Sequence, residues 1–184
     1  GRCGVAPTAA VGIAHQVVSH GLRFSGLQAY HGRAQHLRAF QERQSEIAAA
    51  GEKVRVTLDA LARDGLSCDI VGGAGTGTFA LEAASGVWTE IQAGSYAFMD
   101  ADYARNQGPP PFRQALFVLA QVMSAPRPGF CVVDAGHKAM PTDSGLPLVH
   151  GYPGVACTGL ADEHGKLEAQ PGAAVPRLGE RGRL

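Results

Sequence analysis

Apolar side chains that recur at helical spacing predict two helices in the first third of the chain. Residues 8–20 carry small apolar groups at steps of three or four, ending near Gly21. Residues 34–64 repeat the pattern over a greater length, and Gly65 supplies a helix stop. The apolar face of this longer helix consists of Leu37, Phe40, Ile47, Val54, Leu58 and Leu61. Between the two helices, residues 22–30 alternate apolar and polar groups, which predicts a strand.

The same rhythm continues over the next thirty residues. Strands are predicted at residues 68–71 and 87–92, with a short helix over residues 79–86 between them. A polar loop follows each strand. This alternation is typical of parallel βα units, in which functional groups gather at the carboxyl ends of the strands.

The pattern changes after Asn106. Three consecutive prolines, residues 109–111, predict a rigid, extended connector. Beyond it, β-like runs predict strands at residues 116–123, 130–135 and 155–161. We therefore place a domain boundary near residue 108, with an α/β domain over residues 1–107 and a mostly β domain over residues 108–184.

Composition and charge narrow the possible partners. The chain has 184 residues, of which 45% are hydrophobic, and its 16 basic and 16 acidic side chains cancel. A neutral chain gives no electrostatic reason to expect nucleic acid or an anionic membrane as a partner. Since the sequence contains neither an apolar run of about 20 residues nor a signal-peptide pattern, we expect a cytoplasmic location. Its four widely spaced cysteines indicate reduced thiols.

A glycine-rich loop, residues 72–78, carries the strongest chemical signal. Its four glycines allow the backbone to approach an anion, while Thr76 and Thr78 offer hydroxyl groups. It is neither a P-loop nor a dinucleotide-binding turn, because no lysine follows it and the G-x-G-x-x-G spacing is absent. A second turn, Gly94-Ser95-Tyr96, could hold the same phosphate from the adjacent strand. The alternative is a flexible glycine turn without a ligand.

Other polar residues are weaker candidates when each is taken alone. Tyr30 and His31 follow the first strand and could place a phenol and an imidazole at the same mouth. Arg2 and Gln92 stand at predicted strand ends, where a loop hydrogen bond is the alternative role. The Asp162-Glu163-His164 cluster has metal-ligand residue types, but neighbouring residues point in different directions, so at most two could reach one ion. A solvated turn is the alternative there.

Five ordered motifs resemble D-threonine aldolases. They are Gly21–Phe24 with Gly26–His36, Val71–Phe79, Gln92–Asp100, Val133–Gly136 and Asp162–Gly165. The wider group includes D-serine dehydratases and alanine racemases, and it implies a pyridoxal 5'-phosphate (PLP) barrel followed by a β-domain. The implied fold class is α/β: the C-terminal part of a TIM-type (β/α)8 barrel over residues 1–107, then the start of a mostly-β domain over residues 108–184.

The resemblance also implies roles for individual residues. The implied cofactor contacts are Arg2, Gln28, Gly73, Gly75, Thr76, Gln92, Gly94, Ser95 and Tyr96. Gln92 matches a position near the pyridine nitrogen where alanine racemases use arginine, and a neutral glutamine would tune the ring differently. Tyr30 and His31 match residues at the catalytic mouth. Asp162 matches a carboxylate beside a divalent metal such as Mn or Mg, where it would hold a metal-bound water rather than ligate the ion.

The implied activity is a lyase reaction that cleaves small D-3-hydroxy-amino acids to glycine and an aldehyde, in a monomer or homodimer. A D-serine dehydratase-type ammonia-lyase and a non-catalytic PLP-binding remnant are the alternatives. Lys53 falls on the long helix, Lys138 follows Asp134–His137 and Lys166 falls in a hairpin-like turn, so none stands where a barrel places its Schiff-base lysine. We expect that lysine before Gly1 and the primary metal ligands after Leu184. The chain would then be an internal fragment, inactive by itself and prone to aggregate because its barrel is open.

Overall fold

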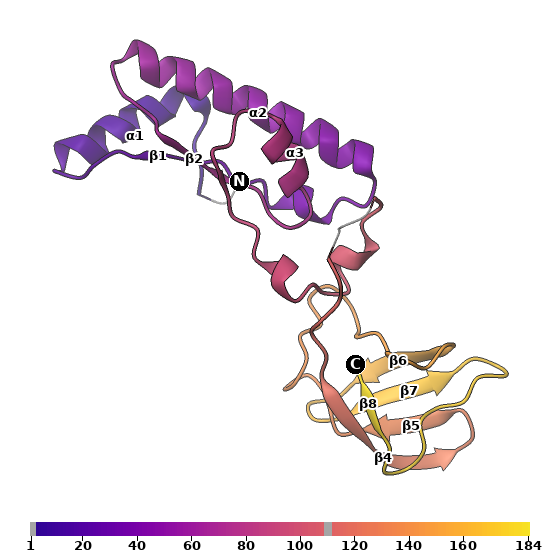
Figure 1. The fold of residues 1–184 in the computed structure, drawn as a ribbon. Coiled ribbons are helices and arrows are strands. Elements are labelled where there is room, and N and C mark those ends of the chain that lie inside the picture. The colour runs from indigo at the N-terminus through magenta and orange to yellow at the C-terminus, as the bar shows by residue number, and fades with distance from the viewer. Residues whose placement is uncertain (1–2, 109–111) are drawn as a thin grey trace. The chain divides into compact units, whose positions relative to one another are not determined.

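The computed structural model describes residues 3–108 and 112–184. The chain divides into two compact units, Gly1–Arg113 and Gln114–Leu184 (Figure 1). This division lies a few residues beyond the boundary predicted near residue 108.

The first unit is built on a small parallel sheet. Its strands are β1 (Gly26–Gln28), β2 (Ile70–Gly73) and β3 (Glu90–Ile91), in the order β1-β2-β3. Gln28 pairs with Gly72, and Gly73 pairs with Ile91. Because all three strands are parallel, their carboxyl ends meet at one edge of the sheet.

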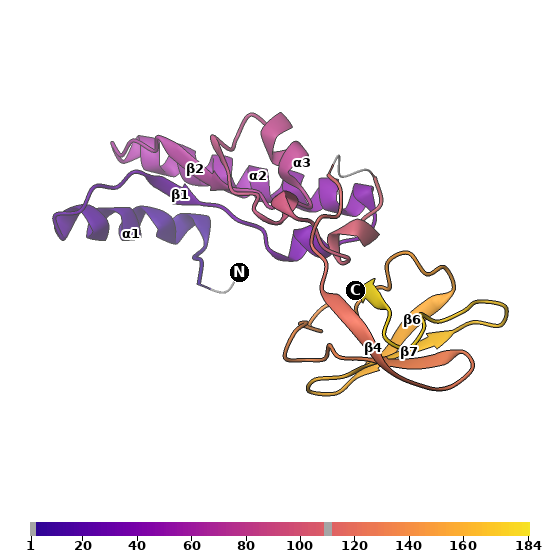
Figure 2. The same cartoon turned by 60° about the horizontal axis from the view of Figure 1, so that its bottom comes forward.

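Helices pack beside this sheet. They are α1 (Pro7–Ser19), α2 (Phe40–Arg63) and α3 (Phe79–Ala84), and Figure 2 shows α2 running along the strands. Ile47 and Val54 of α2 pack with Val71 of β2 and with Trp88 in a buried cluster. Burying an aliphatic side chain of this size stabilises the fold by about 1.5–3 kcal/mol, so this layer supplies much of the stability of the unit.

The predicted helix over residues 34–64 is broken near its start. Arg33–His36 form a short 3-10 helix, η1, and α2 begins only at Phe40. Leu37 lies between them with an extended backbone (φ −72°, ψ 126°). The buried Arg43 guanidinium donates to the Leu37 carbonyl at 2.6 Å, which replaces a helical partner for that carbonyl. Two further 3-10 turns, η2 (Ser95–Ala97) and η3 (Tyr103–Arg105), follow β3.

The second unit is an antiparallel sheet with the strand order β6-β7-β5-β4-β8. Its strands are β4 (Leu119–Arg127), β5 (Phe130–Val133), β6 (Val155–Leu160), β7 (Gly165–Ala169) and β8 (Arg181–Arg183). The prediction of a turn at Lys166 was wrong, because Lys166 lies on β7 and pairs with Val132. The inward-facing Gly165 and Leu167 alternate with the exposed Lys166 and Glu168, as expected for a strand with one buried face.

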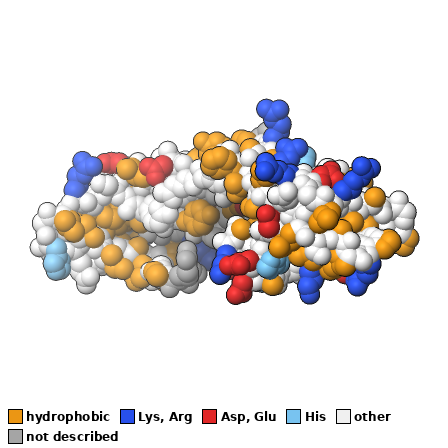
Figure 3. Space-filling model, turned by 90° about the horizontal axis from the view of Figure 1, so that it is seen from below, with side chains coloured by type: hydrophobic (Ala, Val, Ile, Leu, Met, Phe, Trp, Pro, Cys, Tyr) orange, Lys and Arg blue, Asp and Glu red, His pale blue; other side chains and the backbone are white. Residues whose placement is uncertain are grey.

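Cysteines, charge and hydropathy follow simple patterns in the described part of the chain. All four cysteines are free thiols; Cys131 and Cys157 are buried in the second unit, and Cys3 is exposed. Basic and acidic side chains are interspersed on the face shown in Figure 3. Within residues 3–108 and 112–184, no helix has the length and apolar character needed to cross a membrane.

Candidate functional site

The loops after β2 and β3 lie side by side at the carboxyl edge of the parallel sheet. The Tyr96 backbone N–H donates to the Thr76 hydroxyl at 3.0 Å, which joins the two turns directly. Thr76 is almost completely buried, at 4% exposure. The structure therefore brings the glycine-rich loop and the Gly94–Tyr96 turn together, as neighbouring parallel strands require.

Five backbone amides in these two turns are free to donate. Ala74, Gly75 and Thr76 of the first turn, and Gly94 and Ser95 of the second, have N–H groups without an acceptor among the described residues. The three residues of the first turn are buried. A buried N–H without a partner costs about 1–3 kcal/mol, so a native loop that leaves several unpaired is suited to an external acceptor.

Close packing fixes the backbone of the first turn. A Cβ at Gly75 would stand 2.5 Å from the Gln35 side-chain oxygen and 2.6 Å from the Tyr30 hydroxyl, which leaves room only for glycine. The preceding Ala74 takes a left-handed conformation (φ 66°) that alanine adopts rarely. Such local strain is retained where the surroundings hold the chain firmly.

The second turn is open by contrast. A Cβ at Gly94 would meet no atom within 4 Å, and its φ of −123° is ordinary. Gly94 is therefore not required by packing within the described residues. Its missing side chain keeps space open beside the free amides of Gly94 and Ser95.

Two glutamines bridge the sheet next to these turns. Gln28 donates to the Gln92 side-chain oxygen at 2.7 Å, and Gln92 donates back to the Gln28 oxygen at 3.1 Å. Gly72 of β2 lies beneath this pair, since a Cβ there would come within 2.8 Å of the Gln92 amide nitrogen. Gln92 also donates to Glu90 at 2.9 Å. The pair presents neutral amide groups, both exposed, at the carboxyl edge of the sheet.

A group of hydroxyls lies beside the turns. The Tyr30 hydroxyl approaches Gly75, and the Ser95 hydroxyl lies near the Tyr103 phenol. Burial, together with the nearby Tyr30 and Asp100, raises the pKa of Tyr103 to about 12, so this phenol stays neutral. Tyr103 was missed in the sequence because it belongs to none of the loop motifs.

His31 turns toward a helix rather than toward the glutamine pair. Its Nε2 atom lies 3.0 Å from a carboxylate oxygen of Glu46 on α2. This contact gives the imidazole a positioning partner. The catalytic role of His31 stays a prediction, as does that of Tyr30. Arg2 lies outside the described residues, so its cofactor contact also stays a prediction.

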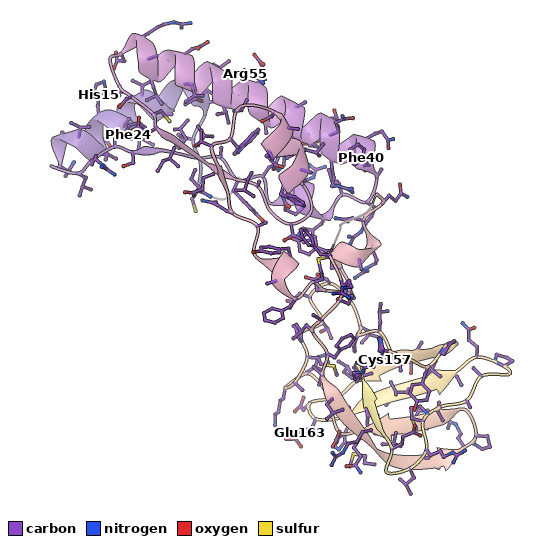
Figure 4. The ribbon with its side chains drawn as sticks, viewed as in Figure 1. His15, Phe24, Phe40, Arg55, Cys157 and Glu163 are labelled. Atoms are coloured by element: carbon purple, nitrogen blue, oxygen red, sulfur yellow. The ribbon has the colours of Figure 1, made fainter. Side chains whose placement is uncertain are left out.

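Asp162 stands in the turn between β6 and β7. Its carbonyl accepts the Lys138 backbone N–H at 2.9 Å, and the neighbouring Glu163 forms an ion pair with the Lys138 ammonium at 2.9 Å. Figure 4 places Glu163 in this outer loop of the β unit. Over the described part of the chain, no group of three or more His, Cys, Asp or Glu side chains is arranged to hold a metal ion. The metal-linked role of Asp162 stays a prediction.

Solved structures with the same architecture define the fold. An alanine racemase from Oenococcus oeni covers 98% of this chain at 11% identity with a TM-score of 0.56. The D-threonine aldolase from Filomicrobium marinum covers all of it at 51% identity and a TM-score of 0.95, and the match spans 50% of that protein. The predicted fold class is confirmed: an α/β, barrel-derived part is followed by the start of a β-domain.

The sequence comparisons point to one group of enzymes. A D-threonine aldolase from Arthrobacter sp is 46% identical over 97% of this chain, and a 3-hydroxy-D-aspartate aldolase from Paracoccus denitrificans (strain Pd 1222) is 44% identical over 94%. Residues 115–184 match the family described as a putative serine dehydratase domain. The resemblance to D-threonine aldolases is thus confirmed. The chain spans about half the length of the curated relatives it matches, 48% and 47% respectively.

Proposed function

We propose that this chain forms the phosphate-binding part of the cofactor site in a PLP-dependent lyase that acts on D-3-hydroxy-amino acids. The observation that carries the proposal is the set of five free amides on two adjoining turns, Ala74–Thr76 and Gly94–Ser95. The relatives support the substrate class, because their names include D-threonine aldolase and 3-hydroxy-D-aspartate aldolase. The proposed reaction is cleavage to glycine and an aldehyde.

The residues of the two turns fit a phosphate group. A phosphate dianion carries three terminal oxygens, and each accepts hydrogen bonds from backbone N–H groups. A hydrogen bond to a charged group contributes about 1.5–3 kcal/mol, so several such bonds would offset the cost of ordering the turns. The open space at Gly94 and the close packing at Gly75 complement each other, because one turn leaves room and the other is held rigid.

The proposed roles of the remaining cofactor contacts follow from their positions. When bound, PLP supplies an electron sink for the carbanion left at Cα after the bond to Cβ breaks. Gln28 and Gln92 present neutral amides rather than a cation, which favours weak polarisation of the ring by this chain. The Tyr30 hydroxyl lies beside Gly75, and Tyr103 keeps a neutral phenol that can donate a hydrogen bond at physiological pH.

The lysines of this chain lie elsewhere. Lys53 is on α2, Lys138 follows β5 and Lys166 is on β7, so none belongs to the loops after β1, β2 or β3. We therefore expect the 184-residue chain to bind the cofactor phosphate without completing the reaction.

Binding of PLP compared with pyridoxal tests the phosphate site. The two molecules share the ring and differ by the phosphate group, so the purified chain should bind PLP at least about tenfold more tightly. Equal affinities would contradict the proposal. Incubation with PLP, a divalent metal and D-threonine should give no aldehyde; release at the rate of a full-length aldolase would overturn the expected inactivity.

A dehydratase is the second candidate. The D-threo-3-hydroxyaspartate dehydratase from Delftia sp. HT23 is 25% identical over 96% of this chain with a TM-score of 0.72, and the match spans 52% of that protein. An elimination releases ammonia and a keto acid, whereas an aldolase releases glycine and an aldehyde. Product analysis on a protein that extends over the full length of the relatives distinguishes the two.

A further inference from the structure

A buried hydrogen-bonded chain lies behind the first turn. Gln35 of η1 donates through Nε2 to the Thr78 hydroxyl at 2.7 Å, and Thr78 donates to a carboxylate oxygen of Glu82 on α3 at 2.8 Å. All three side chains are nearly inaccessible: Gln35 is 1% exposed, Thr78 2% and Glu82 1%. Buried polar groups of this kind are held only where their partners are fixed.

The side-chain oxygen of Gln35 contacts the glycine-rich loop (residues 72–78, the phosphate turn). Its side-chain oxygen accepts the Gly77 backbone N–H at 3.0 Å. The same oxygen would lie 2.5 Å from a Cβ at Gly75, and the Gln35 carbonyl would lie 2.5 Å from a Cβ at Gly77. Gln35 therefore packs against both of these glycines and bonds one of them.

The Gln35 amide cannot easily rotate away from this arrangement. Its nitrogen also donates to the His31 carbonyl at 3.2 Å, and the backbone carbonyl of Gln35 accepts the Asn106 side-chain N–H at 2.9 Å. The side chain is thus fixed at both polar atoms. It pairs the Gly77 N–H, whereas the N–H groups of Ala74, Gly75 and Thr76 have no acceptor among the described residues.

We propose that Gln35 is a positioning residue for the phosphate turn: it holds Gly77 inward so that the amides of Ala74, Gly75 and Thr76 converge on the ligand. Thr78 and Glu82 hold Gln35 in that orientation. This inference rests on the proposed PLP-phosphate site. It deepens that site, since Gln35 touches the turn and not the ligand.

The test compares PLP with pyridoxal in variants of the whole chain. Gln35→Ala should weaken PLP binding on the order of tenfold and leave pyridoxal binding within about twofold. A purely structural role would lower the stability and weaken both ligands alike, so the ratio of the two affinities separates the roles. Gln44→Ala, at an exposed position of α2, is the matched control and should keep the wild-type ratio.

A second pair of variants covers the case in which Gln35→Ala does not fold. Thr78→Val removes the hydroxyl that accepts from Gln35 and should reduce the PLP preference, while Thr78→Ser keeps the hydroxyl and should restore it. An unchanged PLP-to-pyridoxal ratio in Gln35→Ala, or in Thr78→Val, would overturn the inference while the phosphate site stands. A wild-type chain without any PLP preference would overturn the proposed function, and the inference with it.

Discussion

Replacing Gly75 with alanine tests whether the first turn is held as tightly as its contacts indicate. The new Cβ would lie 2.5 Å from the Gln35 side-chain oxygen and 2.6 Å from the Tyr30 hydroxyl. Tyr30 is 42% exposed and can swing outward, but Gln35 is 1% exposed and bonded at both of its side-chain polar atoms. The turn must therefore shift against Gln35.

The magnitude follows from two opposing effects. Overpacking a buried site costs about 1–3 kcal/mol of unfolding free energy. Replacing glycine by alanine restricts the unfolded chain and returns about 0.4–1 kcal/mol. Gly75 has no positive φ, so no backbone penalty is added. We expect a net loss of roughly 1–2 kcal/mol and, because three free amides are displaced, a PLP affinity at least about tenfold weaker.

Urea unfolding and PLP titration measure the two effects separately. Gly12→Ala is the control, because Gly12 is exposed in the helix α1 and a Cβ there would meet nothing within 4 Å. It should leave PLP binding unchanged and stabilise the helix by up to about 1 kcal/mol. A Gly75→Ala chain that is as stable as wild type and binds PLP equally well would refute the reasoning.

Three further substitutions probe the surrounding structure. Burial raises the pKa of Glu82. Its contribution to the free energy of unfolding is therefore full below the ordinary carboxyl pKa and is lost as the pH rises through the raised value. Glu82→Gln should remove this pH dependence from the free energy of unfolding measured in urea, and the same pH dependence in wild type and variant would contradict the reasoning. Desolvation raises the pKa of Asp102, but hydrogen bonds from Arg38 and His36 outweigh it and hold the pKa low. The contribution of Asp102 to the free energy of unfolding is present above the ordinary Asp pKa and is lost as the pH falls through the lowered value. Asp102→Asn should therefore lower the free energy of unfolding by about 1–2 kcal/mol at pH 7 and by less in acid. A decrease that does not depend on pH would count against this. Leu167→Ala empties a site that is 1% exposed in the β unit and should cost about 2–5 kcal/mol by calorimetry, whereas a loss below about 1 kcal/mol would show that the site is not close-packed.

The sequence pattern located most elements of both units. The helix predicted at residues 8–20 is α1, and the glycine-rich loop follows a buried strand as expected. These predictions succeeded because hydrophobic periodicity and glycine clusters act locally. The resemblance to D-threonine aldolases added the fold class, which local patterns alone do not determine.

Where the prediction failed, hydrogen bonds and strand pairing that apolar spacing does not encode were responsible. The long helix breaks before Phe40 because Arg43 donates to the Leu37 carbonyl, and nothing in the apolar spacing signals that bond. Strand β7 carries a lysine and a glutamate on its exposed face, so its local sequence is compatible with a polar turn. Its pairing with β5 and β6 makes it a strand.

The candidate site was only partly visible in the sequence. The two turns could be named from their glycines, but Gln35 and Tyr103 gave no comparable signal. The sequence does not distinguish a buried glutamine from an exposed one. Thr78, the hydrogen-bond partner of Gln35, is 43 residues away in the chain. The free state of the amides at Ala74–Thr76 depends on the three-dimensional hydrogen-bond pattern, which no motif encodes.

An NMR titration of the chain with PLP addresses the two-turn phosphate site most directly. The backbone amide signals of Ala74, Gly75, Thr76, Gly94 and Ser95 should move together and saturate with PLP, because in the proposed site each would donate to the same phosphate. Pyridoxal should leave these five signals largely in place. If the five amides stay unmoved while PLP shifts signals elsewhere, the turns do not hold a phosphate and the assignment fails.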